Sequence, residues 1–150
     1  MTTYSSKTDG KDHINVYSKG KTKLGRNLSN FAKFPIRTDD GSFYSIEGYW
    51  YWLLTQHEAL RKMWGWNAKM LGRELLEDKD REWCDSDVFK SKILHAIEIK
   101  IDTYPVISDQ FYDSTLPFTH YYEYYGKVVI PEGGEWIVEF LEKKRCPNGQ

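Results

Sequence analysis

The sequence predicts an α+β fold that is mostly helical, in a single compact domain with a few short strands from both halves of the chain. Apolar residues recur at helical spacing over residues 46–54, 85–101 and 133–145. Short β-rich stretches lie near both ends, at residues 13–18 and 119–131. The chain has 150 residues, no internal repeat and no low-complexity tract, which fits one domain with a real hydrophobic core.

The boundaries of this domain follow from composition. The first dozen residues are polar, so we expect residues 1–12 to be a flexible N-terminus, residues 13–145 to form the domain and residues 146–150 to be a flexible C-terminus. The N-terminus has no apolar stretch typical of a signal peptide, and the chain has no apolar run of about 18 residues. We therefore expect a cytoplasmic protein without membrane contact.

The elements of the N-terminal half are short. Residues 13–18 alternate and predict a strand. Residues 19–27 hold two glycines and four basic residues, which predicts a loop with a local positive patch. Residues 28–36 resemble a strand interrupted by Pro35, as at a sheet edge. Residues 38–45 predict a turn and a short extended piece that leads into a helix.

That helix begins with Ser45 as its predicted N-cap, because a serine hydroxyl accepts a backbone N–H of the first turn. Its apolar face consists of Ile46, Tyr49, Trp50, Leu53 and Leu54. Glu47 stands in the first turn, where the helix dipole favours an anion. Two interpretations remain open for Glu47: a solvated capping residue, or a carboxylate with a chemical role.

Residues 58–79 are helical in pattern but contain Gly65 and Gly72, which predicts two segments. Residues 85–101 predict one long helix, capped by Asp85 or Ser86. Its apolar stripe consists of Phe89, Ile93, Ala96, Ile97 and Ile101.

The C-terminal part predicts extended structure over residues 119–131, with a turn or bulge at Gly126. Residues 133–145 predict a closing helix with a basic last turn. Its inward face is expected to consist of Ile137, Phe140 and Leu141.

Composition limits the classes of function. The formal net charge of −1 argues against an extended nucleic-acid track, so any such contact has to be local. The aromatic fraction of 16% is high, and Tyr and Trp both fill cores and stack on planar ligands. Neither Cys84 and Cys146 nor the four histidines have metal-ligand spacing, and no dinucleotide or Walker motif occurs. We expect no metal and no cofactor.

The candidate site residues are polar and aromatic side chains in separated segments. They are Arg26, Ser29, Asn30, Phe31, Glu47, Tyr49, Trp50, Lys69, Arg73, Trp83, His120, Tyr122 and Tyr125. Each has a structural explanation as well: Asn30 can fix a turn, Lys69 and Arg73 can form a solvated helix face, and the tyrosines can fill a β face.

Four blocks of these residues occur in a recognisable order. They are Ser29-Asn30-Phe31-Ala32 followed by Pro35; Gly41, Phe43 and Ser45-Ile46-Glu47; Ala68-Lys69-Met70-Leu71-Gly72-Arg73; and Glu82-Trp83. In their order and spacing over roughly residues 14–145, the sequence resembles the YbiA-like, or NADAR, family, in its branch common in tailed bacteriophages. The chain departs from that family beside Glu47, where Gly48 and Tyr51 or Trp52 stand in the region of a histidine and a glutamine, and at residues 122–126.

The resemblance implies an N-glycosidase, which hydrolyses a bond between ribose C1′ and a nitrogen. Family substrates include aminopyrimidine ribose phosphates of the riboflavin pathway and ADP-ribose attached to guanine in nucleic acid. It implies Glu47 as acid/base or as stabiliser of an oxocarbenium-like state, in the cytoplasm of the host if a phage encodes the chain. Lys69 is a second catalytic candidate, as an amine that forms a Schiff base or as a phosphate ligand.

The partner implied is a nucleotide-like small molecule or ADP-ribosylated nucleic acid, held by Arg26 and Arg73 at phosphate and by aromatic rings at the base. Two alternatives remain open. The chain can be a non-catalytic phage protein that binds ADP-ribose or a nucleotide, or an interaction module that uses exposed Tyr and Trp against a host protein. The sequence leaves the oligomeric state open.

Overall fold

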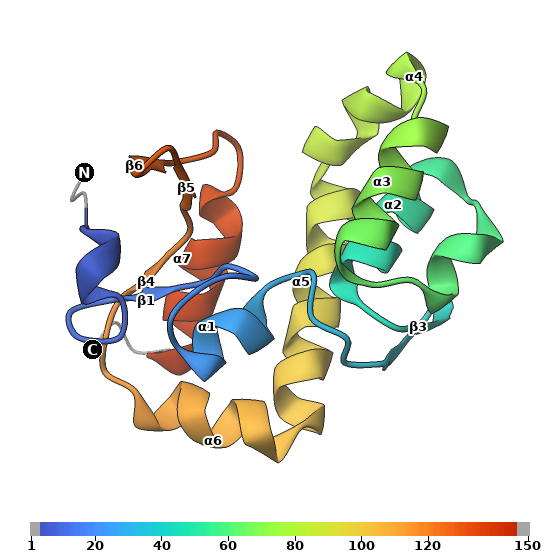
Figure 1. The fold of residues 1–150 in the computed structure, drawn as a ribbon. Coiled ribbons are helices and arrows are strands. Elements are labelled where there is room, and N and C mark those ends of the chain that lie inside the picture. Colours follow the sequence, from blue (N-terminus) through green and yellow to red (C-terminus); the bar gives the residue numbers. More distant parts are fainter. Residues whose placement is uncertain (1–3, 147–150) are drawn as a thin grey trace. The chain divides into compact units, whose positions relative to one another are not determined.

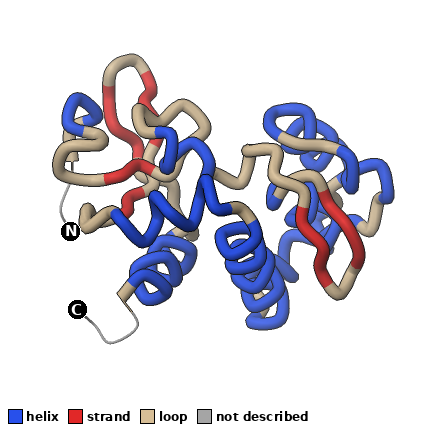
Figure 2. Tube along the Cα trace, turned by 90° about the horizontal axis from the view of Figure 1, so that it is seen from below, coloured by secondary structure: helices blue, strands red, loops and turns tan. Residues whose placement is uncertain are grey.

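The computed structural model describes residues 4–146, which group into two compact units (Figure 1). Unit 1 comprises Met1–Ser29 and Pro105–Gln150, of which residues 4–29 and 105–146 are described. Unit 2 is the continuous segment Asn30–Tyr104. The predicted fold class is confirmed: the described residues form a mostly helical α+β fold whose strands are short and come from both halves of the chain (Figure 2).

Unit 2 is a β-hairpin followed by helices. Its elements are β2 (Ile36–Thr38), β3 (Gly41–Phe43), α2 (Ile46–Thr55), η2 (Glu58–Lys62), α3 (Gly65–Leu75), α4 (Asp78–Arg81), η3 (Glu82–Asp85) and α5 (Asp87–Thr103). Strands β2 and β3 pair in antiparallel register, with Ile36 opposite Phe43. Helix α2 packs against α3 and α5, and α5 also contacts β2. The whole predicted stripe of α5 is buried, which places the core of this unit between these elements.

The predicted start of α2 is confirmed. The Ser45 hydroxyl accepts the N–H of Gly48 at 3.0 Å and donates to the carbonyl of Met63 at 2.8 Å. The cap therefore serves two segments, because it satisfies an N–H of α2 and also ties α2 to the chain just before α3.

The two glycines of the 58–79 stretch have different roles. Gly65 has a φ of 60° at the first position of α3, so the predicted break there is confirmed. Gly72 does not break the helix: α3 runs through it to Leu75. A Cβ at Gly72 would overlap the ring of Tyr51, so this glycine allows α2 and α3 to approach each other.

Unit 1 combines both ends of the chain. Its elements are η1 (Ser6–Thr8), β1 (Ile14–Asn15), α1 (Lys23–Leu28), α6 (Pro105–Asp113), β4 (Phe118–Thr119), β5 (Tyr122–Tyr124), β6 (Lys127–Val129) and α7 (Glu135–Arg145). Strands β1 and β4 pair in parallel, with Ile14 opposite Phe118. A buried hydrogen bond of 2.7 Å between His13 Nε2 and the Tyr121 hydroxyl adds a second link between the two ends.

The hairpin of β5 and β6 confirms the extended structure and the turn predicted at Gly126. The turn residues Tyr125 and Gly126 have φ values of 49° and 76°, and two successive positive values suit the tight hairpin turns. The closing helix is also confirmed as α7; Leu141 is buried, whereas Ile137 and Phe140 remain partly exposed.

Two local predictions in the N-terminal half are wrong, and one helix of the chain was missed. Residues 23–28 form helix α1 rather than a loop, because Thr22 caps it and Leu24 and Leu28 bury one face. Residues 29–35 contain no strand; the strand begins at Ile36, after Pro35. Helix α6 was not predicted at all.

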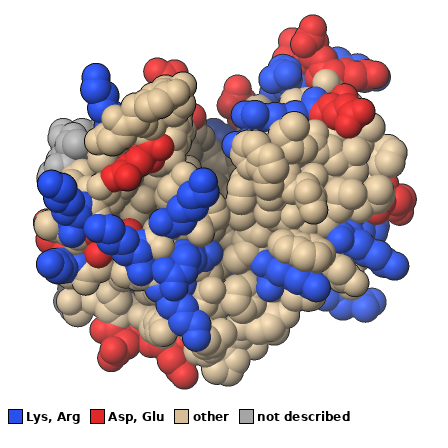
Figure 3. Space-filling view, in the orientation of Figure 1, with Lys and Arg blue, Asp and Glu red and all other residues tan. Residues whose placement is uncertain are grey.

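The basic residues of the 19–27 stretch are exposed, as expected for a local positive patch. Figure 3 shows Lys and Arg side chains gathered on one part of unit 1. Within residues 19–27, the exposed basic residues are Lys19, Lys21, Lys23 and Arg26.

The described part of the N-terminal dozen has defined local structure. The Asp9 carboxylate accepts the backbone N–H of Asn15 at 3.0 Å and that of Lys21 at 2.9 Å. The flexibility of both chain ends stays a prediction, and residues 1–3 and 147–150 lie outside the described residues. Within residues 4–146, no helix combines the length and the apolar character needed to cross a membrane.

Candidate functional site

Glu47 lies half-buried in the first turn of α2. Its backbone N–H donates to the carbonyl of Asn30 at 2.9 Å, so the segment before β2 lies against the start of the helix. Burial raises the pKa of Glu47 from 4.5 to about 7, and the positive charges of Lys69 and Arg73 oppose this shift. Although the residue keeps some exposed surface, the loss of water around its carboxylate therefore outweighs two nearby cations.

Lys69 and Arg73 reach Glu47 from α3. They are four residues apart, so they lie one turn from each other on one side of the helix. The Lys69 amine lies 5.5 Å from the ring centroid of Trp66 and 5.7 Å from that of Phe31. Arg73 is exposed, so its guanidinium is accessible from solvent.

Tyr51 lies near enough to Glu47 and Arg73 to feel the charges of both. It follows Glu47 by one helical turn, is 8% exposed and lies with its ring against Gly72. Burial and the negative charge of Glu47 raise the pKa of its hydroxyl, whereas the positive charge of the nearby Arg73 lowers it. The sequence analysis did not select Tyr51 as a site residue. Its position four residues after Glu47 in a predicted helix could have indicated that the two side chains are neighbours.

Trp50 and Trp83 meet at one buried ring. The two indoles pack edge-on against Phe89 with centroid distances of 4.8 and 5.6 Å. Both are half-buried, and Trp50 follows Glu47 by three residues, so it lies on the same side of α2. Asn30, Phe31, Trp50 and Trp83 all belong to unit 2, the unit that also carries Glu47.

Tyr49 lies elsewhere. It is 2% exposed, packs on Phe43 at a centroid distance of 4.5 Å and donates its hydroxyl to Asp40 at 2.6 Å. Because it follows Glu47 by two residues, it points to the other side of α2. The structure gives Tyr49 a place in the core of unit 2, and we leave it out of the candidate site.

Five predicted site residues belong to unit 1. The Arg26 guanidinium donates to the carbonyls of Gly20 and Lys21, both at 2.9 Å, and so ties down the loop before α1. Ser29 is buried and ends α1 by donating its N–H to the carbonyls of Gly25 and Arg26. Both residues have clear structural roles in this unit.

The other three lie around the β5–β6 hairpin. His120 Nδ1 donates to the carbonyl of Val16 at 2.7 Å, beside the β1–β4 pair. Tyr122 and Tyr125 are 38% and 89% exposed. The candidate site described here is therefore that of unit 2, with Glu47, Lys69, Arg73 and Tyr51 at its centre.

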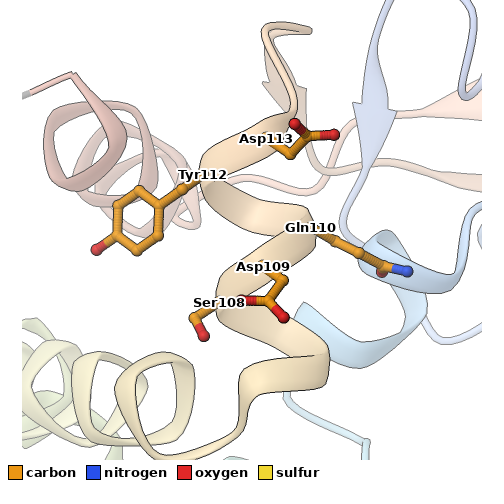
Figure 4. A pocket seen from close by; sticks show the side chains of 5 residues that line it. All are labelled: Ser108, Asp109, Gln110, Tyr112 and Asp113. Atoms are coloured by element: carbon orange, nitrogen blue, oxygen red, sulfur yellow. The ribbon is translucent and has the colours of Figure 1, made fainter.

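Within the described residues, no group of three or more His, Cys, Asp and Glu side chains has an arrangement that could hold a metal ion. An open surface hollow of about 730 Å³ lies along α6 and is lined by Ser108, Asp109, Gln110, Tyr112 and Asp113. Figure 4 shows that these side chains point in different directions around one helix. They do not converge on a ligand, so the hollow is a weaker candidate than the surroundings of Glu47.

No family model and no curated protein matches the chain. Among solved structures, the chain is similar to the E. coli protein YbiA, determined by NMR, with a TM-score of 0.64 and 20% sequence identity. The similarity covers 89% of this chain and 83% of that one. The chain therefore has a YbiA-like fold, and at this identity the likeness concerns the fold alone.

Proposed function

We propose that this protein is an N-glycosidase that hydrolyses a bond between ribose C1′ and a base nitrogen, with Glu47 as its acid/base. The single observation that carries the proposal is a half-buried carboxylate whose pKa is raised to about 7 beside Lys69 and Arg73. A group with a pKa near the working pH is present in both protonation states, which general acid–base catalysis needs.

The reaction follows from that pair of states. Protonated Glu47 donates its proton to the departing nitrogen as the C1′–N bond breaks, and positive charge develops at C1′. The resulting carboxylate stabilises this oxocarbenium-like state and takes a proton from water, whose oxygen bonds to C1′. The products are a free ribose hydroxyl and a protonated base, and Glu47 is again protonated.

The surrounding side chains supply binding. The exposed guanidinium of Arg73 suits a phosphate, which it can hold through two parallel hydrogen bonds. Phe31, Trp50 and Trp83 offer ring faces or edges for a base. The substrates are a riboflavin-pathway aminopyrimidine ribose phosphate or ADP-ribosylated guanine in nucleic acid, as the resemblance to the YbiA-like family and to its phage branch implies.

Lys69 offers a second route. Its amine attacks C1′, the base leaves with a proton, and the opened sugar remains as a Schiff base on Lys69 until water releases it. Borohydride reduces such a Schiff base to a stable amine, so trapped protein gains the mass of the sugar. Trapping in the wild type that is lost in Lys69→Arg supports this route; cleavage without any trapped adduct supports direct hydrolysis.

The test of the proposed function pairs the wild type with Glu47→Gln. Both substrates are incubated with each protein, and the released sugar and base are measured by mass spectrometry. Glu135→Gln is the matched control, because Glu135 is also a first-turn helix glutamate but is exposed. We expect a loss of activity of at least about a hundredfold in Glu47→Gln alone, with unchanged folding by circular dichroism.

Absence of cleavage by the folded wild type on both substrates contradicts the proposal. A ligand-induced rise in melting temperature with ADP-ribose, abolished in Arg73→Ala, would then support the alternative of a non-catalytic binding protein. If ADP-ribose does not raise the melting temperature, the alternative of a protein-interaction module remains.

A further inference from the structure

Tyr51 lies beside Glu47, and the function proposed above gives it no role. It follows Glu47 by one turn of α2, so the two side chains lie on the same side of the helix. The next residue, Trp52, points elsewhere: its ring packs on Phe43 at a centroid distance of 5.4 Å, and its indole N–H donates to Glu58 at 2.8 Å. Of these two neighbouring aromatic residues, Tyr51 is therefore the one that belongs to the candidate site.

The ring of Tyr51 is fixed by its packing. It lies against Gly72 of α3, at a point where any Cβ on that residue would overlap the ring. The absence of a side chain at Gly72 thus makes the space that the ring fills. Only 8% of Tyr51 is exposed, so its side chain cannot turn into solvent without opening the contact between α2 and α3.

The hydroxyl of Tyr51 lies near charges of both signs. Burial and the negative charge of Glu47 raise its pKa, whereas the positive charges of Arg73 and Arg81 lower it. Because the pKa lies above its ordinary value of 10, the phenol keeps its proton at neutral pH. Tyr51 therefore offers a neutral hydroxyl, whose oxygen can accept a hydrogen bond from a nearby guanidinium.

Arg73 is the cation that this hydroxyl can serve. It follows Gly72 directly in α3, so its side chain starts next to the point where the ring of Tyr51 meets the helix. Arg73 is exposed, and an arginine side chain in solvent has many rotamers, the loss of which opposes binding of a ligand. A fixed acceptor beside the guanidinium reduces this loss, because part of the restriction is present before the ligand arrives.

We propose that Tyr51 is a positioning residue for substrate binding: its hydroxyl accepts a hydrogen bond from the Arg73 guanidinium and orients it toward the phosphate of a substrate held at Glu47. Tyr51 acts through Arg73 and does not itself touch the reacting atoms. This inference rests on the N-glycosidase proposed above for its substrate, and on the packing of Tyr51 against Gly72 for the position of the hydroxyl.

The test removes the hydroxyl and keeps the ring. A residue that only fills the space over Gly72 tolerates Tyr51→Phe, whereas a residue that orients Arg73 does not. On the substrate that the wild type cleaves, we expect Tyr51→Phe to raise KM about tenfold, the lower end of what a hydrogen bond to a charged group contributes. The kcat should stay within about twofold, because the lost interaction is the same in the bound substrate and in the transition state.

Tyr49→Phe is the matched control. Tyr49 is also a buried tyrosine of α2, but its hydroxyl donates to Asp40 at 2.6 Å, on the other side of the helix. Its loss should lower the melting temperature and leave KM within about twofold of wild type. Melting curves of all variants establish that folded proteins are being compared.

Two measurements do not depend on cleavage. Calorimetry with ADP-ribose gives the Kd of wild type and Tyr51→Phe, and of Arg73→Ala with and without Tyr51→Phe. If Tyr51 acts through Arg73, its substitution should raise the Kd about tenfold in the wild type and within about twofold on the Arg73→Ala background. NMR of the ligand-free wild type gives the order parameter of the Arg73 Nε–H group without any substitution. We expect a value above about 0.6; a lower value, typical of a mobile group, overturns the inference.

The outcomes separate this inference from the proposed function. A higher Kd for ADP-ribose in Tyr51→Phe, without cleavage of any substrate by the wild type, supports the role of Tyr51 and overturns the glycosidase. Cleavage with equal KM and Kd in wild type and Tyr51→Phe overturns the role of Tyr51 and leaves the glycosidase. An equal loss of affinity on the Arg73→Ala background also overturns it, because Tyr51 then acts without Arg73. A folded wild type that neither cleaves nor binds overturns both.

Discussion

Replacing Glu47 with glutamine should change how the stability of the protein depends on pH. In the folded protein the pKa of Glu47 is raised to about 7, whereas in the unfolded chain it has its ordinary value near 4.5. Between these two values the folded state keeps the proton and the unfolded state releases it. Stability falls with rising pH wherever the folded state binds more protons, so the wild type should lose stability across this window.

The magnitude follows from the two pKa values. One pH unit of difference corresponds to about 1.36 kcal/mol, so the interval from 4.5 to about 7 corresponds to about 3 kcal/mol. Glu47→Gln keeps the size of the side chain and removes its charge. Relative to the wild type, the variant should therefore gain about 3 kcal/mol of unfolding free energy between pH 4.5 and pH 8.

The assay is urea unfolding followed by tryptophan fluorescence, for both proteins at pH 4.5, 5.5, 6.5, 7.5 and 8.5 and constant ionic strength. Only the difference between the two proteins is interpreted, because all other titrating groups contribute to both. Glu135→Gln, with its exposed glutamate, should show no such trend. A difference between Glu47→Gln and wild type that stays constant within about 0.5 kcal/mol over this range would refute the reasoning and identify Glu47 as a solvated cap.

Three further substitutions test the framework of unit 2. Gly72→Ala should lower the unfolding free energy by about 1–3 kcal/mol, because its Cβ would overlap the Tyr51 ring; a melting temperature equal to that of wild type would contradict this contact. Ser45→Ala should lower it by about 1 kcal/mol or more in urea unfolding, because both hydrogen bonds of the cap are lost, and an unchanged midpoint would argue against the cap. Burial lowers the pKa of Lys100 from 10.5 to about 7, so the unfolded state binds more protons between these values and stability should rise with pH there. Lys100→Met should be more stable than wild type at pH 7 by several kcal/mol and lose that advantage by about pH 10.5; a pH-independent difference would exclude this explanation.

The helices with strong periodicity could be predicted from the sequence. In α5 the five apolar residues of the predicted stripe are all buried, and the start of α2 at Ser45 was recognisable because capping is a local interaction. The turn at Gly126 was predictable for the same reason, since the left-handed conformation of a turn has a clear residue preference.

Elements stabilised mainly by tertiary packing could not be predicted. Helix α1 has only six residues, and four basic residues lie in or near it. Its apolar pattern consists of Leu24 and Leu28 alone, which is too little to predict a helix. A glycine at position 72 predicts a helix break from the sequence alone. In the structure it allows close contact between two helices, because the ring of Tyr51 occupies the space of a Cβ. Such contacts depend on residues more than 20 positions away, which local propensity does not describe.

The candidate site shows the same division. The identity of Glu47 and its place in a first turn were readable from the sequence, but its pKa depends on burial and on the approach of Lys69 and Arg73 from another helix. Tyr49 was predicted both on the apolar face of its helix and as a candidate site residue. It lies in the core, because a shift of two residues from Glu47 turns a side chain to the other side of a helix.

The parallel pairing of β1 with β4 has a consequence for the order of folding. Ile14 meets Phe118 across more than a hundred residues, so unit 1 cannot assemble on the ribosome until most of the chain has emerged. Unit 2 is one continuous segment and is complete once Tyr104 is free. During synthesis, the part of the molecule that carries Glu47 therefore has the opportunity to form first. A nascent chain that stalls before residue 118 lacks the partner of its own first strand, while every residue of the Glu47 site is already present.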